Sequence, residues 1–417
     1  MANKTPTTHK PRYKHTPLGW IPEEWEVKEL GDVIINSYSG GTPSRNIKKY
    51  YENGTIPWIK SGEINQIFVN ETEEYITEEA LKNSSAKITP KGTLLYALYG
   101  ATAGVVGFTN IDAALNQAIL AIFPNDKELT KQFLFNFLSF NKDNILLEFT
   151  QGGQPNLSAG LVKSLKILLP PIKAQNSIND FISTWDKAIS ITTRLITQKE
   201  KRKKWLMQQL LTGKKRLKGF SGGWNKVKLE SVSDIRRGAS PRPIQDPKWF
   251  SETGRGWIRI SDVTSSNFYL NQTTQYLSNE GADKSVKVDK GDLIMSICAT
   301  IGVPVIVNIP ACIHDGFVLF REYEKNLTTF FLYYFIQYIT EKLSGEGQPG
   351  TQKNLNTSIV GNIQLNLPKI EEQTAITSVL QSADKEIQIL KTKLEKLKTQ
   401  KKGLMQVLLT GKVRVKI

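Results

Sequence analysis

The phrase LMQQLLTGKKRL, residues 206–217, occurs again almost unchanged as LMQVLLTGKVRV, residues 404–415. Aligning the chain with itself at this offset of about 198 residues extends the match over most of its length. The matched segments keep the same order, and the period is far longer than that of a solenoid, so the sequence indicates a tandem duplication of whole domains. The further pairs are WEVKEL (25–30) with WNKVKL (224–229), SGGTPSRN (39–46) with RRGASPRP (236–243), IPWIKSGEI (56–64) with RGWIRISDV (255–263), PKGTLLYALYGATAGVVG (90–107) with DKGDLIMSICATIGVPVI (289–306), QGGQPNLS (151–158) with GEGQPGTQKNLN (345–356), and LLPPIKAQNSI (168–178) with NLPKIEEQTAI (366–376).

Each copy ends in a segment whose apolar residues are spaced alternately four and three positions apart. A repeat of about 3.5 residues gives a narrow apolar stripe that one helix does not bury alone, and it is typical of a coiled-coil seam. Gly213 and Gly411 then follow as left-handed C-caps, with Lys214 and Lys412 beside the negative end of each helix dipole. The predicted seam residues are Ile182, Trp185, Ile189, Ile196, Leu206 and Leu210 in the first copy, and Leu380, Ile387, Leu390, Leu394, Leu397, Leu404 and Leu408 in the second.

The best partner for each of these helices is the other one. Each spans about forty residues, or roughly 60 Å at about 1.5 Å per residue, and a whole globular domain lies between them in the sequence. An antiparallel pair with one globular domain at each end would therefore have pseudo-two-fold symmetry. Lys203 and Lys401 hold the same seam position, where a polar residue commonly fixes the register of a coiled coil. The alternative is that each helix packs separately on its own domain.

The segments before the helices have a mixed pattern. Residues 16–170 and 220–368 contain short apolar or alternating runs bounded by turn residues, which predict strands. Each segment also contains one predicted helix, over 130–148 and 328–343. We interpret two pairs of tryptophans as core anchors rather than as stacking platforms for bases, namely Trp25 with Trp224 and Trp58 with Trp257.

The sequence therefore predicts an α+β protein with two homologous globular domains and two long helices that form an antiparallel coiled coil. The expected organisation is a flexible basic tail (1–15), a first domain (16–170), a first spacer helix (171–215), a second domain (216–368), and a second spacer helix with a C-terminal tail (369–417).

The charge of the chain favours a nucleic-acid partner. Its 417 residues include 55 basic and 39 acidic side chains, a formal net charge of +16, and each cation placed near a phosphate releases condensed counterions. A ribosome-associated or simply basic protein is the alternative. No apolar run approaches the length of a membrane span, the N-terminus lacks the apolar core of a signal peptide, and Cys298 and Cys312 cannot make a disulfide framework. We therefore expect a cytoplasmic protein with no membrane partner.

Four loops have the composition of a surface that reads bases. TPSRNIKK (42–49) and RRGASPRPIQ (236–245) combine turn residues with Arg, Ser, Asn and Gln, and the segments 151–158 and 345–354 are similar. Arginine can bind guanine bidentately, Asn and Gln can bind adenine, and hydroxyls serve phosphates or bases. For any one residue, an ordinary polar surface loop is the alternative. Because framework positions repeat while loop residues differ, we expect two copies of one scaffold that read two different sequences.

The sequence contains none of the common catalytic motifs. Only three histidines occur, His9, His15 and His314, and no Cys/His cluster suits zinc. The TGKK and TGKV segments lack the leading glycine of a phosphate-binding loop, and GATAGVVG (100–107) is better explained as a turn at a strand edge. The chain also lacks the Asn-Pro-Pro-aromatic tetrad of amino-methyltransferases and an acid–lysine nuclease signature. We therefore predict a recognition protein without a catalytic residue.

This arrangement resembles the specificity subunit of type I restriction–modification systems. The resemblance runs from about residue 17 to 415, and it is carried by the paired GGTPSR/RGASPR and PWIKSG/GWIRIS segments, the GQP loops, the LPP/LPK starts of the helices and the repeated LLTGK ends. Each motif is weak alone, but they occur together, in order and twice. In that family each globular unit is a target-recognition domain that reads half of an asymmetric bipartite DNA target. The helices set the spacer and dock methyltransferase subunits.

The resemblance implies double-stranded DNA, two methyltransferase subunits and two motor–nuclease restriction subunits as partners. The complex would methylate adenine with S-adenosylmethionine and cleave unmodified DNA with ATP and Mg, so all cofactors would belong to the partner subunits. A non-catalytic coiled-coil scaffold protein and a stand-alone DNA modification enzyme are the alternative functions. The scaffold does not explain the charge, and the enzyme would need a cofactor-binding fold for which the chain has no room.

The DNA contacts carried over from the resemblance lie in the divergent loops of both copies. In the first copy they are Thr42, Ser44, Arg45, Lys60, Ser61, Tyr99, Gln154 and Asn156. In the second copy they are Arg237, Ser240, Arg242, Arg259, Ser261, Thr300, Gln348 and Lys353.

Overall fold

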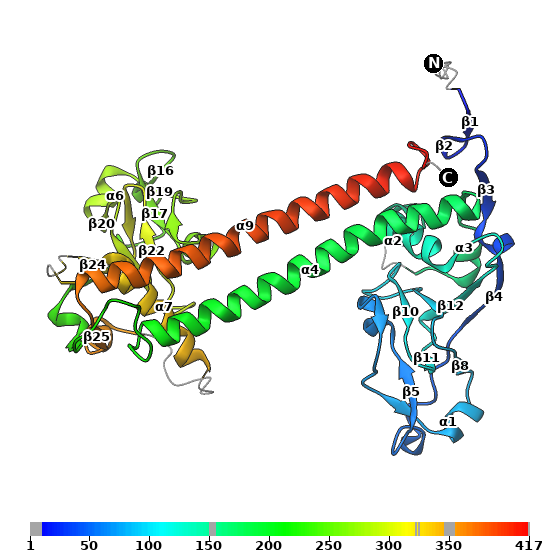
Figure 1. Ribbon diagram of the computed structural model, residues 1–417, viewed down its shortest axis with the longest axis horizontal. Coiled ribbons are helices and arrows are strands. Elements are labelled where there is room, and N and C mark those ends of the chain that lie inside the picture. The colour runs from blue at the N-terminus through cyan, green and yellow to red at the C-terminus, as the bar shows by residue number, and fades with distance from the viewer. Residues whose placement is uncertain (1–10, 150–155, 322, 324–325, 346–354, 416–417) are drawn as a thin grey trace. The chain divides into compact units, whose positions relative to one another are not determined.

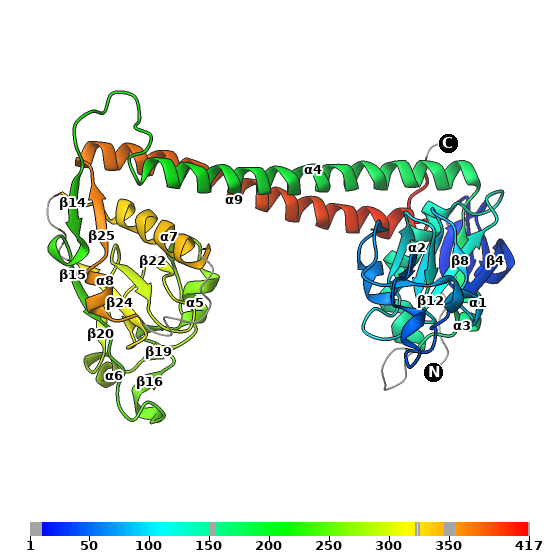
Figure 2. The same ribbon diagram turned by 90° about the horizontal axis from the view of Figure 1, so that it is seen from below.

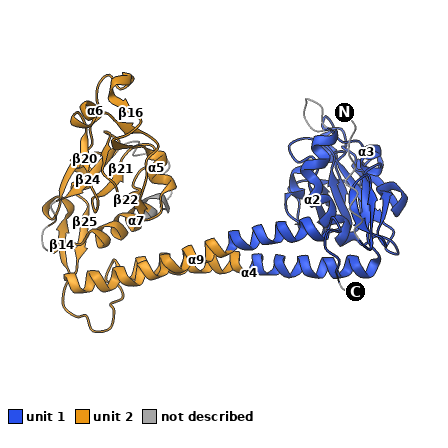
Figure 3. Cartoon of the chain, turned by 90° about the horizontal axis from the view of Figure 1, so that it is seen from above, with its two compact units in different colours: residues 1–191, 394–417 blue, residues 192–393 orange. Residues whose placement is uncertain are grey.

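The chain folds into two compact units, each of which contains part of both long helices. The computed structural model describes residues 11–149, 156–321, 323, 326–345 and 355–415. We call the two bodies unit 1 (residues 1–191 and 394–417) and unit 2 (residues 192–393) (Figure 3). The boundaries between them fall inside helix α4 (Ile172–Leu210) and helix α9 (Ile370–Leu408), whose course along the chain can be followed in Figure 1.

Unit 1 is built on two sheets of order β4-β12-β9-β10-β6 and β7-β5-β11-β8. Neighbouring strands are antiparallel except for the parallel pairs β6 with β10 and β5 with β11. The larger sheet consists of β4 (Ile34–Ser39), β12 (Ile119–Pro124), β9 (Leu94–Ala97), β10 (Val106–Thr109) and β6 (Phe68–Val69). The smaller consists of β7 (Tyr75–Ile76), β5 (Ile56–Ile59), β11 (Ala113–Leu115) and β8 (Ile88–Thr89), and β3 (Glu26–Glu29) pairs separately with β13 (Lys166–Leu169).

The larger sheet is covered on both faces, so the side chains of its central strand alternate between two cores. Leu94 and Tyr96 of β9 belong to the core that contains helix α2 (Lys131–Phe149), whereas Leu95 and Ala97 pack toward the smaller sheet. Every residue of β9 is buried, as the period of two requires when both faces are covered. Helix α2 lies between this sheet and helix α4 (Figure 2).

Unit 2 repeats this architecture, with sheets of order β15-β24-β21-β22-β18 and β16-β19-β17-β23-β20. Both of these sheets have five strands, and helix α7 (Thr329–Gly345) covers the one that begins with β15, as α2 covers the larger sheet of unit 1 (Figure 2). The strands are β15 (Asp234–Arg237), β24 (Phe317–Arg321), β21 (Leu293–Ser296), β22 (Pro304–Val307), β18 (Tyr269–Leu270), β16 (Phe250–Ser251), β19 (Tyr276–Leu277), β17 (Arg255–Ile258), β23 (Ala311–Ile313) and β20 (Val286–Val288), with β14 (Asn225–Lys228) paired to β25 (Gln364–Leu367). The predicted α+β class with two homologous domains is confirmed.

Short helices begin at side chains that cap them. Thr77, Ser158 and Ser278 each accept a hydrogen bond from the backbone N–H three residues later, and Asn356 does the same. These residues precede α1 (Glu78–Lys82), α3 (Ala159–Lys163), α6 (Asn279–Asp283) and α8 (Thr357–Gly361). Helix α5 spans Ile260–Ser265, and 3-10 turns occur at Leu30–Val33, Lys48–Tyr50, Ser61–Asn65, Leu229–Ser231 and Pro247–Trp249.

Helices α4 and α9 are each 39 residues long and pack against one another in antiparallel directions. In unit 1, Ile178 and Ile182 from the start of α4 share a core with Met405 and Leu408 from the end of α9. In unit 2, the end of α4 shares a core with the start of α9 in the same way (Figure 3). The predicted pair of long antiparallel helices is confirmed, and the alternative of two separately packed helices is excluded.

A glycine with φ +70° follows the last residue of each helix by three positions, namely Gly213 after α4 and Gly411 after α9. L-residues rarely adopt this left-handed conformation, which explains why the LLTGK phrase occurs at both ends. A Cβ on Gly411 would lie 2.6 Å from a side-chain carbon of Pro22 and 3.2 Å from the Trp25 ring, so this position also requires the absence of a side chain.

The predicted seam residues are all at least partly buried. Ile182, Ile196, Leu210, Leu380, Ile387 and Leu408 are buried, while Trp185, Ile189, Leu206, Leu390, Leu394, Leu397 and Leu404 are half-buried. The two seam lysines make reciprocal ion pairs, because Lys203 Nζ lies 2.7 Å from Asp384 Oδ1 and Lys401 Nζ lies 2.6 Å from Asp186 Oδ1. The same lysine–aspartate pair therefore forms once in each unit.

The N-terminal segment is structured closer to the start of the chain than the expected tail of residues 1–15 implies. Strand β1 (Tyr13–Thr16) pairs with β2 (Gly19–Pro22), and the Tyr13 hydroxyl donates to the Lys412 carbonyl at 3.2 Å. The sequence of β1 has no apolar alternation, so its conformation depends on these tertiary partners.

Among the helices that the structure describes, none combines the length and the apolar character that a membrane span requires.

Candidate nucleic-acid interface

The loop that follows β4 in unit 1 and the loop that follows β15 in unit 2 are each anchored by a glycine. The Gly40 N–H donates to the Ile119 carbonyl, and a Cβ on Gly40 would lie only 2.1 Å from the Leu115 carbonyl oxygen. Gly238 occupies the same place in unit 2, where a Cβ would lie 2.1 Å from the His314 carbonyl oxygen. These close approaches align the two loops residue by residue.

The alignment shows that the two predicted loop arginines are not equivalent. Counting from Gly40 and Gly238, Thr42 corresponds to Ser240 and Ser44 corresponds to Arg242. Arg45 therefore corresponds to a proline in unit 2. Each unit has one arginine at the tip of this loop, but the arginines start from neighbouring backbone positions.

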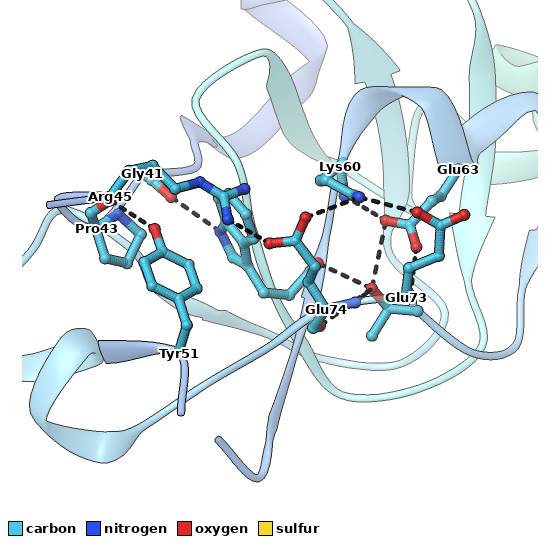
Figure 4. A network of polar contacts seen from close by, with 10 residues as sticks. Gly41, Pro43, Arg45, Tyr51, Lys60, Glu63, Glu73 and Glu74 are labelled. Atoms are coloured by element: carbon cyan, nitrogen blue, oxygen red, sulfur yellow. Dashed lines mark hydrogen bonds and ion pairs between the residues drawn. The ribbon is translucent and has the colours of Figure 1, made fainter. Parts of the chain in front are cut away.

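Arg45 is held between two aromatic rings and a carboxylate (Figure 4). Its guanidinium carbon lies 4.5 Å from the centre of the Tyr51 ring and 4.9 Å from that of the Trp58 ring, and Nη1 donates to Glu74 Oε2 at 2.5 Å. The Tyr51 hydroxyl donates to the Pro43 carbonyl at 2.6 Å, which fixes the first ring. Arg45 nevertheless keeps about half of its side chain exposed, so its direction is fixed while its surface stays open to a ligand.

Lys60 joins the same network through two adjacent carboxylates (Figure 4). Its Nζ lies 2.9 Å from Glu73 Oε2 and 2.9 Å from Glu74 Oε1. Glu63 organises the backbone beneath, because it accepts from the Lys60 N–H at 2.6 Å and from the Glu73 N–H at 2.8 Å. Hydrogen bonding to Arg45, and secondarily to Lys60, lowers the pKa of Glu74, so this carboxylate is ionised at neutral pH and bridges two cations.

Among the described residues, no hydrogen bond or ion pair joins the other predicted contacts of unit 1 to Arg45. Thr42 and Ser44 are exposed on the loop, and Ser61 is half-buried in the 3-10 turn that follows Lys60. Tyr99 is half-buried, and its backbone forms an antiparallel bridge with that of Asn156, which is exposed. The remaining predicted contact in this copy, Gln154, lies outside the described residues.

In unit 2, Asp315 gathers three of the predicted residues. The Ser240 hydroxyl donates to its Oδ1 at 2.7 Å, Arg242 Nη2 lies 3.3 Å from its Oδ2, and Arg237 Nε donates to its backbone carbonyl at 2.8 Å. The hydrogen bond from Ser240 lowers the pKa of the Asp315 carboxyl. Arg237 and Arg242 both remain exposed.

His314 has a structural place beside this cluster. Its ring centre lies 5.8 Å from that of Trp257 and 4.7 Å from that of Phe317, and its Nδ1 accepts from the Gly316 N–H at 2.9 Å. Burial, with the positive charge of Arg259 as a smaller cause, lowers the pKa of His314. The ring is therefore neutral at neutral pH, which suits a packing role rather than phosphate binding.

Three further predicted contacts of unit 2 are exposed. Arg259 and Ser261 flank the start of α5, where Asp262 accepts from the Arg259 N–H at 2.9 Å, as Glu63 accepts from Lys60 in unit 1. Thr300 is exposed in the turn between β21 and β22. Gln348 and Lys353 lie outside the described residues.

Sequence reasoning missed the carboxylates that hold the cations, chiefly Glu73, Glu74 and Asp315. Side chains that read bases are mostly hydrogen-bond donors such as arginine, whereas these carboxylates act by holding the donors. A signal was present, since the acidic run ETEE (71–74) lies close to Lys60 in the sequence. No group of three or more His, Cys, Asp or Glu side chains suited to a metal ion occurs among the residues that the structure describes.

Comparison with known proteins identifies the family. A specificity subunit of Methanocaldococcus jannaschii, named putative type I restriction enzyme MjaX specificity subunit, is 26% identical over 97% of both chains. The crystal structure of the HsdS subunit from Thermoanaerobacter tengcongensis has a TM-score of 0.52 at 20% identity, and covers 94% of this chain and 98% of that one. A solved chain from work on complex assembly and conformational transition of the type I R-M system has a TM-score of 0.66 at 19% identity, with coverage of 94% and 99%. The profile described as type I restriction modification DNA specificity domain matches residues 22–201 and again 221–399, so the chain belongs to this family and is a type I specificity subunit with two recognition domains.

Proposed function

We propose that each unit reads one half of an asymmetric bipartite site in double-stranded DNA. The observation that carries this proposal is that two units with one framework present different charged groups at the same place. Unit 1 presents Arg45 and Lys60 bridged by Glu74, whereas unit 2 presents Arg237 and Arg242 around Asp315. Arginine reads guanine in the major groove, and a shared scaffold with different side chains reads different bases.

We further propose that helices α4 and α9 set the spacing between the half-sites and dock two methyltransferase subunits, which are joined by two motor–nuclease subunits. Adenine methylation with S-adenosylmethionine, and cleavage with ATP and Mg, would then be performed by these partners in the cytoplasm. The chain itself contributes recognition and no catalytic group. The named relatives, which are specificity subunits of type I restriction enzymes, support this assignment.

The test uses the full chain assembled with two methyltransferase subunits, its proposed partners. Sequencing of DNA methylated by this complex identifies the target, and duplexes with either half scrambled then measure discrimination across a salt series. We expect a bipartite target, weaker binding when either half is scrambled, and a linear fall of log affinity with log salt. Equal affinity for intact and scrambled duplexes would contradict the proposal, and methyl transfer by the chain alone would contradict its non-catalytic role.

A further inference from the structure

We propose that Glu74 is a positioning residue that determines specificity in unit 1, by holding the Arg45 guanidinium in one direction and cancelling the charge of Lys60. This inference rests on the proposed function, because it assigns a role within the recognition of the first half-site.

The geometry holds the Arg45 guanidinium in a fixed orientation before any DNA is bound. The Trp58 indole under it is 2% exposed and donates from Nε1 to the Gly41 carbonyl at 3.0 Å, so the ring cannot turn away. The Tyr51 ring is fixed by its own hydrogen bond, and Glu74 fixes the remaining rotation of the guanidinium. An ordered arginine has less rotamer entropy to lose on binding than a free one. A guanidinium has five N–H donors, so donors beyond the one bound by Glu74 are left for a base edge.

The charge balance removes attraction that carries no sequence information. Lys60 lies between Glu73 and Glu74, and these carboxylates raise its pKa, so Lys60 stays charged and paired with both of them. A paired lysine adds less to phosphate binding than a free one, and phosphate binding is the part of DNA affinity that is independent of sequence. Because this contribution is the same for every sequence, pairing Lys60 lowers the affinity for unrelated DNA and leaves discrimination at the first half to Arg45.

Unit 2 supplies an internal comparison. The backbone N–H of Trp58 donates to the backbone carbonyl of Glu74 at 3.0 Å, and the backbone N–H of Trp257 donates to that of Gln275 at 2.7 Å. Gln275 therefore has the same position in unit 2 as Glu74 has in unit 1. Gln275 is neutral, and among the described residues no carboxylate forms an ion pair with Arg259, the counterpart of Lys60. The carboxylate bridge is therefore specific to unit 1.

The test is Glu74→Gln in the full chain with its methyltransferase subunits, which keeps the size of the side chain and gives it the amide found in unit 2. We expect discrimination against a scrambled first half to fall by between about 5-fold and about 100-fold, the range of one bidentate arginine–guanine contact. Binding to unrelated duplex should become tighter, with a salt slope steeper by roughly 0.9 for each freed cation that reaches a phosphate. Discrimination at the second half should not change.

Glu71→Gln is the matched control, since Glu71 is exposed in the same segment and its substitution removes the same charge without touching Arg45. Equal effects of the two variants, or unchanged discrimination in Glu74→Gln, would overturn the proposal. In an Arg45→Ala background, Glu74→Gln should have no further effect on discrimination, and a persisting effect would show that Glu74 does not act through Arg45. If Glu74→Gln does not fold, the variant Arg45→Lys replaces it in the test. Lysine keeps the charge but lacks the planar guanidinium that Glu74 orients, so Arg45→Lys should lower discrimination at the first half by a similar factor. A wild-type complex that ignores the first half would instead contradict the proposed function.

Discussion

Substitution of Asp384 by alanine should destabilise the protein more than substitution of its counterpart Asp186. Asp384 pairs with Lys203 at 2.7 Å and also accepts from the Tyr334 hydroxyl at 2.7 Å. Its loss leaves a lysine whose side chain is only 15% exposed and a phenol without its acceptor. Breaking a fully buried ion pair costs about 3–5 kcal/mol, and because Asp384 is 35% exposed we expect roughly half of this, about 2 kcal/mol. Lys203 keeps a hydrogen bond to Gln337 Oε1, at 3.0 Å, which limits the loss.

Asp186→Ala is the matched control, because it removes the same kind of partner from Lys401. This pair is more exposed, and we expect a loss of about 0.5–1 kcal/mol. In both variants alanine replaces aspartate inside a helix, so the gain in helix propensity is the same and cancels when the two losses of stability are compared. Urea unfolding at pH 7, followed by circular dichroism and fluorescence, measures both. Equal losses of stability in the two variants would refute the assignment of the larger cost to the Lys203–Asp384 pair. It would also be refuted if the double variant Lys203→Asp with Asp384→Lys failed to recover most of the stability lost by either single reversal.

Three further outcomes follow from the same structure. Arg45→Ala and Arg242→Ala should each reduce discrimination by about 1–3 kcal/mol at one half-site only, measured with single-base-substituted duplexes; relaxation of both halves by either variant would contradict one domain per half-site. Insertion or deletion of residues within 190–200 should change the spacing of the methylated target and leave its two half-sequences intact, as read by sequencing of modified DNA. A fragment ending near residue 218 should form a two-fold dimer with itself and, with methyltransferase subunits, should select an inverted repeat of the first half-site, which sedimentation and methylation sequencing would check.

The fragment dimer is expected because the apolar contacts that it loses at the helix ends have equivalents on its own helix. In unit 1, Met405, Leu408 and Leu409 from the end of α9 pack with the start of α4. Met207, Leu210 and Leu211 from the end of α4 are their counterparts at the same offset and pack in the same way in unit 2. Lys203 of one copy would likewise meet Asp186 of the other, as Lys401 meets Asp186 in the whole chain. A fragment that stays monomeric even with methyltransferase subunits would contradict this equivalence.

The helices and their ends could be predicted because their signals are local. A spacing of four and three along one segment fixes which residues form the seam, and a glycine at the end fixes the cap, without reference to the rest of the chain. The partners of the seam lysines were not predicted. Asp186 and Asp384 lie on the edge of the apolar stripe, where any polar residue is compatible with the pattern, and only the packed register shows which lysine each aspartate meets.

The candidate site was predicted as a set of loops but not as a network. Lys60 and Glu74 are far apart in the sequence, and they meet because β5 pairs with β7 and places the end of one strand beside the start of the other. Arg45 reaches the same carboxylate from the loop that follows β4. The pairing of segment 39–46 with segment 236–243 matches Arg45 with Arg242, because the two motifs are similar in sequence. Only the close approach of Gly40 and Gly238 to the neighbouring strand resolved the difference of one position.

The duplication separates the residues that build the scaffold from those that distinguish the copies. Glu63 and Asp262 make the same cap in both units, so an acidic residue at that position is part of the framework. The carboxylates that hold the loop arginines are not shared, because unit 1 uses Glu74 before β7 and unit 2 uses Asp315 before β24. The sequence preference of two such recognition domains can therefore change when the carboxylate that orients an arginine occurs at a different position of the chain. The sheets beneath do not have to change. On this reasoning, transplanting Arg45 without Glu74 into another recognition domain should transfer its charge but not its sequence preference.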